Sequence, residues 1–209
     1  MSIEPAFVHI YIPPTDISID NTLILLHGTG GDEESLLQLA GFIAPQSGVL
    51  SPRGKVLENG MPRFFRRFSE GVFDLEDLRL RTAELASFIK AASEEYGFPS
   101  DMLSAVGYSN GANMAASLML TYPRIFRKAV LFHPMVPFVP EKLPDSSATD
   151  VLITAGTNDP IVRPEESQKL ADLLGRTGAR VELFWQENGH DLTRDEINAA
   201  KSFLSESKI

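Results

Sequence analysis

Residues 102–111 read Met-Leu-Ser-Ala-Val-Gly-Tyr-Ser-Asn-Gly, and this stretch decides the fold. An apolar run typical of a buried strand, Met102 to Val106, ends in the pattern Gly-x-Ser-x-Gly. A sharp turn from strand to helix holds such a serine in a strained backbone conformation, so its neighbours must lack side chains that would collide. Gly107 and Gly111 meet this requirement around Ser109. We expect Ser109 to be a nucleophile; the alternative is an ordinary helix N-cap in a glycine-rich turn.

The same order of strand and helix recurs along the chain. Strands are expected at Phe7–Ile12, Thr22–Leu26, Val49–Leu50, Met102–Val106, Lys128–Phe132, Val151–Thr154 and Val181–Trp185. Helices are expected at Glu33–Ala40, from near Asp74 to near Gly97, at Asn110–Leu120, Pro164–Leu174 and Arg194–Leu204. Such alternation predicts an α/β fold with a mostly parallel, twisted sheet and helices on both faces, in a single domain over residues 1–209.

Two segments break the alternation. Ser51 to Phe73 is rich in Gly, Pro and charge and shows no sustained period, which predicts a long loop. Pro134 to Thr149 carries four prolines, which favours an extended connector over a helical cap domain. The sequence therefore predicts an open site without a cap.

Composition narrows the functional classes. The 209 residues include no Cys, which rules out disulfides and a cysteine nucleophile. A formal net charge of -9 opposes attraction to nucleic acid and to anionic membranes. Met1 to Val8 lacks the pattern of a secretory signal, and no later apolar stretch is long enough for a membrane span. We expect a cytoplasmic protein with no nucleic-acid partner and no membrane insertion.

A serine nucleophile needs a base, and the chain has 4 histidines. His9 lies inside the first expected strand, and His27 precedes Ser109, against the order Ser, then Asp or Glu, then His. His133 follows the next strand with no acid between it and Ser109, so we expect a pocket wall or a core histidine. His190 lies in a loop before the last helix, from which it can reach over the sheet's carboxyl edge. We predict His190 as the base; the alternative is a surface histidine.

The acid is expected in the loop after the strand that lies between these two residues. There the sequence Thr-Asn-Asp-Pro supplies Asp159, whose carboxylate would hold the tautomer of the base. Asp150 precedes that strand and lies at the wrong end of the sheet. Asp191 and Asp195 are too close to His190 in sequence for the usual arrangement. The competing interpretation of Asp159 is a turn-forming residue.

The sequence His-Gly-Thr-Gly-Gly at residues 27–31 follows a buried strand directly. Such a loop can direct a backbone N–H at developing negative charge, so the main chains of Thr29 and Asn110 are predicted to form an oxyanion hole. A phosphate-binding loop is the alternative. The segment lacks the Lys-Ser/Thr ending of a Walker motif and the glycine pattern of a dinucleotide fold.

Together these elements resemble the carboxylesterase and phospholipase family of α/β hydrolases, which includes acyl-protein thioesterases and, more distantly, dienelactone hydrolases. The stretches 26–32, 62–65, 107–111 and 133–135 are similar to those of bacterial carboxylesterases of the MhqD type. The resemblance implies a capless α/β-hydrolase fold, the triad Ser109, Asp159 and His190, no cofactor and no metal. It also implies a small-molecule ester substrate, short acyl chains and often a homodimer.

The sequence departs from two of these relatives. Dienelactone hydrolases use cysteine where this chain has Ser109, so their substrate does not transfer. Thr29 stands where acyl-protein thioesterases usually carry Leu, which argues against long-acyl protein substrates. A thioesterase or lysophospholipase remains a rival within the fold, and a non-catalytic binding protein on the same scaffold is the other rival.

Residues next to these motifs are expected to line the substrate pocket. They are Gly28, Arg63, Phe64, Phe65, His133, Met135 and Val162. The segment from Ser51 to Phe73 has more basic than acidic residues, and its arginines are Arg53, Arg63, Arg66 and Arg67. One or two of these arginines are candidates to meet an anionic part of the substrate; internal ion pairs are the alternative. Phe64, Phe65 and Phe68 are candidates for an apolar acyl wall, with core packing as the alternative.

Overall fold

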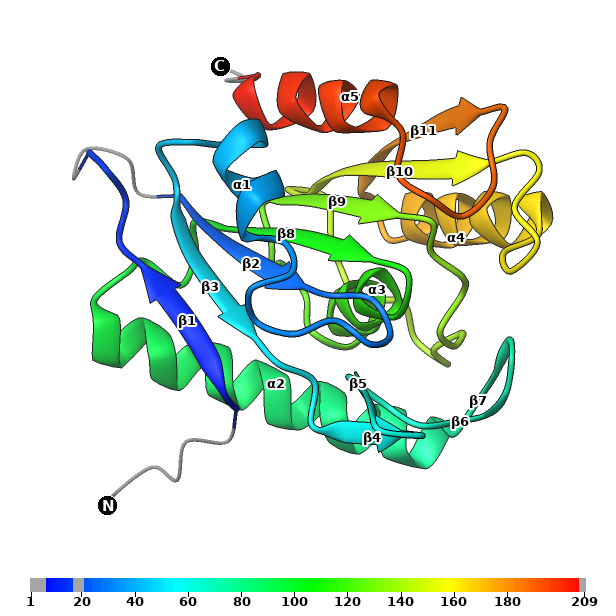
Figure 1. The fold of residues 1–209 in the computed structure, drawn as a ribbon, viewed down its shortest axis with the longest axis horizontal. Helices are drawn as coiled ribbons and strands as arrows, with labels where there is room; N and C mark the ends of the chain where they lie inside the picture. Colours follow the sequence, from blue (N-terminus) through cyan, green and yellow to red (C-terminus); the bar gives the residue numbers. More distant parts are fainter. Residues whose placement is uncertain (1–6, 17–20, 207–209) are drawn as a thin grey trace.

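A seven-stranded sheet forms the centre of the molecule (Figure 1). The computed structural model describes residues 7–16 and 21–206. The prediction that Met1 to Val8 is not a secretory signal falls mostly on residues 1–6, which lie outside the described residues. In spatial order the strands are β1 (His9–Ile12), β3 (Gly48–Pro52), β2 (Thr22–Leu26), β8 (Leu103–Tyr108), β9 (Lys128–Phe132), β10 (Asp150–Gly156) and β11 (Arg180–Gln186). Only β1 is antiparallel to its neighbour in the sheet; the other pairs are parallel.

Helices cover both faces of the sheet (Figure 1). One face carries α1 (Leu37–Ile43) and α5 (Arg194–Ser205); the other carries α2 (Leu75–Tyr96), α3 (Asn110–Thr121) and α4 (Pro164–Arg176). The sheet thus separates two apolar cores. Successive side chains of β2 alternate between them, which is why this strand is apolar throughout. The predicted fold class is confirmed.

Most predicted elements are present, with bounds shifted by a few residues. The start of α2 is capped as expected, since the Asp74 side chain accepts a hydrogen bond from the Asp77 N–H, and the helix ends at Gly97 with φ 74°. The prediction of a helix from Glu33 to Ala40 is wrong at its start. Asp32 Oδ1 accepts hydrogen bonds from the Glu34 N–H and the Ser35 hydroxyl, which stabilises a turn, and α1 begins only at Leu37.

The segment predicted as a long loop instead contains two small hairpins. The first joins β4 (Val56–Glu58) to β5 (Met61–Arg63), and the second joins β6 (Arg67–Ser69) to β7 (Val72–Phe73). Asn59 and Gly60 connect the first pair with φ of 52° and 80°, as a two-residue hairpin turn requires. Strands of two or three residues are too short to show an alternating pattern in the sequence.

The connector after β9 has the predicted extended form. Residues 133–149 are all described and contain no helix or strand, so no cap domain covers the carboxyl edge of the sheet here. Within residues 7–16 and 21–206, no helix is long and apolar enough to cross a membrane.

The turn from β8 to α3 is as sharp as the sequence predicts. Ser109 has φ 51° and ψ -113°, a conformation that L-residues rarely adopt. A Cβ on Gly111 would lie 1.9 Å from the carbonyl oxygen of Leu26, and a Cβ on Gly107 would lie 2.7 Å from Ala112 Cα. Both glycines are therefore required by close backbone contacts.

Replacing Gly111 with Ala should lower the free energy of unfolding by about 3 kcal/mol or more, because the added methyl group collides with backbone that cannot rotate away. The matched control is Gly41→Ala in α1, where an added Cβ meets nothing within 4 Å. The control should leave stability unchanged or raise it by about 0.5–1 kcal/mol through helix propensity. Urea denaturation of both variants measures the difference, and equal effects would contradict the assigned contact.

Candidate active site

Ser109 and His190 meet at the carboxyl edge of the sheet. The Ser109 hydroxyl lies 2.9 Å from His190 Nε2, although 81 positions separate the two residues in sequence. Ser109 follows β8 directly, and His190 lies in the loop between β11 and α5. The structure therefore brings together the predicted nucleophile and the predicted base.

Asp159 completes the line of hydrogen bonds. Its Oδ2 lies 2.7 Å from His190 Nδ1, and its Oδ1 accepts hydrogen bonds from the backbone N–H groups of Ile161 and Val162 at 2.8 and 2.9 Å. Burial opposes the charge on this carboxylate, yet these hydrogen bonds outweigh burial and lower the pKa of Asp159. Since a carboxylate only accepts, His190 carries its proton on Nδ1, which leaves Nε2 free to accept from Ser109.

The loop that carries His190 is fixed from two sides. The Tyr108 hydroxyl donates to the carbonyl oxygen of His190 at 3.0 Å. Burial and the nearby carboxylate of Asp191 raise the pKa of Tyr108 to about 12, so this donor keeps its proton. A Cβ on Gly156 would lie 2.4 Å from the carbonyl oxygen of Gly189, so the end of β10 packs directly on this loop.

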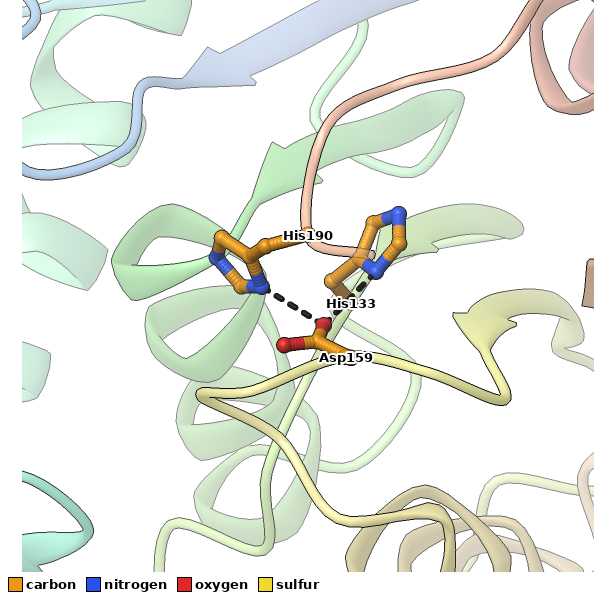
Figure 2. Close-up of side chains that lie close together, drawn as sticks. All are labelled: His133, Asp159 and His190. Atoms are coloured by element: carbon orange, nitrogen blue, oxygen red, sulfur yellow. Dashed lines mark hydrogen bonds and ion pairs between the residues drawn. The ribbon is translucent and has the colours of Figure 1, made fainter. Parts of the chain in front are cut away.

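A second histidine shares the acid (Figure 2). His133 Nδ1 lies 3.0 Å from Asp159 Oδ2, the same oxygen that His190 contacts. Its other ring nitrogen, Nε2, lies 2.9 Å from Glu196 Oε1, an ion-pair contact outside straight hydrogen-bond geometry. The His133 and Glu196 side chains are both 0% exposed. The sequence suggested a wall or core residue for His133 and did not indicate Glu196.

The glycine-rich loop at residues 28–31 is held against the first hairpin. The Gly30 N–H donates to the carbonyl oxygen of Pro62 at 2.9 Å, and Arg63 Nη1 donates to Thr29 Oγ1 at 2.6 Å. Buried His27 donates from Nδ1 to the Gly28 carbonyl oxygen at 2.6 Å and accepts at Nε2 from the Gly54 N–H at 2.9 Å. Burial lowers the pKa of His27, in keeping with this neutral form.

Asn110 lies opposite this loop, at the start of α3. Its backbone N–H belongs to the first residue of the helix and has no intrahelical partner, so it is available to a ligand. Its side-chain oxygen accepts a hydrogen bond from the Phe64 N–H at 2.8 Å. This bond joins α3 to the segment Ser51 to Phe73 that contains the two hairpins, called the hairpin segment below. Both predicted oxyanion residues therefore border the space next to Ser109.

A small cavity opens at Ser109, with about 290 Å³ of empty space that includes open solvent. Of the residues expected to line it, Arg63, His133, Met135 and Val162 do so. Phe64 and Phe65 pack in the core, Phe68 is 75% exposed, and Gly28 lies against the Tyr108 ring. The sequence did not point to Glu70, Phe73, Asn113 and Ile161 as lining residues, although Asn113 lies one helical turn after Ser109 on α3.

The basic residues of the hairpin segment are all paired with acids. Arg63 is 3% exposed and lies 3.2 Å from Glu58. Arg66 contacts Asp74 and Asp77, and Arg67 contacts Glu58 and Glu70. Arg53 and Lys55 contact Glu33 and Glu84. The pairing favours the ion-pair interpretation over an anion site.

His133, Asp159 and His190 also offer ligand atoms within 4.8 Å of one another, a spacing that a metal ion could use. Asp159 Oδ2 is, however, already shared by two ring nitrogens at hydrogen-bond distances. The arrangement is a set of hydrogen bonds and leaves no open ligand positions.

Known proteins are similar to this chain over most of its length. Residues 11–208 match the sequence model of the Phospholipase/Carboxylesterase family. The chain belongs to this family. The resemblance drawn from its motifs is thus confirmed.

Individual members of the phospholipase/carboxylesterase family are close in sequence and structure. The putative hydrolase MhqD of Bacillus subtilis (strain 168) is 49% identical over 201 residues, which are 96% of this chain and 99% of that protein. The crystal structure of the Bacillus cereus carboxylesterase has a TM-score of 0.91 and 48% identity, covering 94% of this chain and 92% of that chain. The carboxylesterase from Mesorhizobium loti has a TM-score of 0.86 and 33% identity, covering 96% and 95%. The chain is therefore a hydrolase of this family.

The charge on Glu196 should contribute to stability above pH 4.5. Burial works against this charge, but the contacts with His133 and Thr193 outweigh it and lower the pKa of Glu196 from 4.5 to about 2. A lowered pKa means that the contribution is complete above the unfolded value and is lost as the pH falls towards 2. Its size is on the order of 3 kcal/mol.

We therefore expect Glu196→Gln to lose less stability than the wild type between pH 4.5 and 2 and to be less stable at pH 7. Denaturant unfolding at a series of pH values measures both effects. Glu94→Gln, at an exposed position of α2, is the matched control and should follow the wild type. If the free energy of unfolding of the Glu196 variant falls with pH as steeply as that of the wild type, the ionised Glu196 carboxylate does not contribute to stability.

Proposed function

We propose that this hydrolase cleaves short-chain carboxylic esters through an acyl-enzyme on Ser109, with His190 as base and Asp159 as its partner. One observation carries the proposal: Ser109 Oγ lies 2.9 Å from His190 Nε2, whose other ring nitrogen lies 2.7 Å from Asp159. This is the relay that activates a serine hydroxyl in acyl transfer.

The reaction has two halves. Ser109 Oγ attacks the ester carbonyl while His190 Nε2 takes its proton, and the same imidazole then protonates the departing alcohol. A water molecule, deprotonated by His190, attacks the acyl-enzyme and releases the acid and Ser109. The backbone N–H groups of Thr29 and Asn110 stabilise the oxyanion in each half. The hydrogen bonds from Arg63 and Gly30 hold the Thr29 loop in place for this task.

The size of the cavity supports short acyl chains. The empty space of about 290 Å³ includes open solvent, so the part enclosed by side chains is smaller still. Met135, Val162 and the Arg67–Glu70 ion pair line it. A long acyl chain would have to displace these groups.

Ser109→Ala should abolish both ester hydrolysis and covalent labelling by a fluorophosphonate, because within residues 7–16 and 21–206 no other hydroxyl is hydrogen-bonded to the His190 ring. Mass spectrometry of the labelled protein locates the modified residue. Ser87→Ala, at an exposed position of α2, removes a serine far from the site and should label as fast as the wild type. Labelling that persists in Ser109→Ala would place the nucleophile elsewhere.

Met135→Ala should move the preference towards longer acyl chains, because it removes a wall of the cavity while the Met135 backbone stays bonded to Asn113. In a series of nitrophenyl esters, we expect the ratio of kcat/KM for octanoate over acetate to rise about tenfold, the effect of about 1.4 kcal/mol of pocket contacts. Met119→Ala removes a buried methionine that does not line the cavity and should leave this ratio unchanged. A wild type that prefers octanoate or a thioester would contradict the proposed substrate class.

A further inference from the structure

His133 lies between two buried carboxylates, and the hydrolytic mechanism above makes no use of it. Its ring nitrogens are 3.0 Å from Asp159 Oδ2 and 2.9 Å from Glu196 Oε1. The three side chains are between 0% and 1% exposed, so water does not separate the charges. Figure 2 shows the His133 and His190 rings on the same oxygen of Asp159.

The remaining contacts of both carboxylates come from donors. Asp159 Oδ1 accepts from two backbone N–H groups, and Glu196 Oε2 accepts from the N–H and the hydroxyl of Thr193, each at 2.8 Å. In these hydrogen bonds both groups act as acceptors, as ionised carboxylates do. The lowered pKa values of Asp159 and Glu196 agree.

A neutral imidazole has one N–H and one lone pair. If His133 were neutral, a ring lone pair would face a carboxylate oxygen at about 3 Å inside the protein, which is strongly repulsive. The doubly protonated ring carries an N–H on both nitrogens, and its positive charge attracts both carboxylates, although the Nε2–Glu196 contact departs from hydrogen-bond geometry. The cation also separates two buried negative charges that would otherwise repel each other.

A positive charge on His133 would act at His190. The two rings have centroids 5.2 Å apart. Polar or charged groups near them include Tyr108 and Ser109 from β8 and its turn, Asp159 after β10, Asp191 beside His190, and Glu196 from α5. Arg63, Arg67 and Glu70 line the same cavity as Ser109 and His133. A buried Asp159 alone would favour the imidazolium form of His190 and so withhold the base; a cation on the far side of Asp159 opposes this.

We propose that His133 is a positioning residue for the acid: as an imidazolium bridging Asp159 and Glu196, it fixes Asp159 Oδ2 and keeps His190 available as a base at lower pH. The proposal rests on the proposed function of the Ser109 site. Glu196 extends the network to α5, because it forms the capping box with Thr193 at the helix start. The order of contacts is Ser109, His190, Asp159, His133 and Glu196.

The protonation state can be measured without any assay of activity. The chain has only 4 histidines, so ¹⁵N NMR of histidine-labelled wild type at pH 8 resolves each ring. We expect one histidine with both ring nitrogens protonated, and its signals should disappear in His133→Gln. Four neutral rings at pH 8 would overturn the proposal, whether or not the variant folds.

The effect on His190 is measured by the pH profile of kcat/KM for a short nitrophenyl ester. His133→Gln removes the cation. We therefore expect the acidic limb of the kcat/KM profile to move to higher pH by about one unit, so that kcat/KM at a given pH on that limb is about tenfold lower. The double variant His133→Gln/Glu196→Gln removes one charge of each sign, so its limb should move in the same direction by less. His9→Gln is the matched control, since His9 bonds to Tyr96 at the sheet edge, and its profile should coincide with the wild type.

An acidic limb of His133→Gln that coincides with the wild type overturns the proposal. If this variant does not fold, the double variant carries the test, and its limb must still lie above that of the wild type. Failure of the proposed function has a different signature: Ser109→Ala would then keep its activity, while the NMR result on His133 would be unaffected.

Discussion

The approach of α3 to β2 at Gly111 is the constraint on which the site depends. With a Cβ there, the nearest atom would be the Leu26 carbonyl oxygen at 1.9 Å, and the carbonyl oxygen of His27 would lie at 2.6 Å. The first turn of α3 therefore lies against the end of β2, directly before the glycine-rich loop. For this reason the Asn110 N–H and the Thr29 loop border the same space, and the strained turn at Ser109 points its hydroxyl into it.

The order of strands in the sheet explains why distant residues meet. β8, β9, β10 and β11 are successive parallel neighbours, and each is followed by one member of the network: Ser109, His133, Asp159 and His190. Tyr108 and Thr154 both pair with Phe132, so the first three strands end nearly level. Ser109 and His133 leave their strands with φ of 51° and 52°, so the chain turns sharply directly after β8 and β9. The parallel strands thus bring the four residues to one edge of the sheet.

Sequence reasoning succeeded where a single local rule decides the structure. The glycines around Ser109 and the apolar residues of β2 each have one physical explanation. The chain order of serine, acid and histidine is a property of this fold, and it selected the three side chains that the structure brings together. Sequence reasoning failed where two interactions compete. The Asp32 side chain outcompetes the helix start predicted at Glu33, and the Asn59–Gly60 turn folds strands too short to be recognised. His133 and Glu196 contact each other across 63 positions, and no local pattern marks such a pair.

The hairpin segment has more basic than acidic residues, and these basic residues stabilise the fold through ion pairs. Its arginines and lysine are paired with acids from their own hairpins and from neighbouring elements. Arg63 is almost fully buried, with contacts to Glu58 and the Thr29 hydroxyl. A buried guanidinium is stable only when its donors are satisfied. The hydrogen bond from Arg63 to Thr29 is one of these contacts, so it holds the Thr29 loop in place. In the described part of the chain no cap domain covers the carboxyl edge, and the two hairpins lie beside the site instead. Arg67 and Glu70 line the cavity, and the first hairpin holds the Thr29 loop, whose backbone would receive the oxyanion.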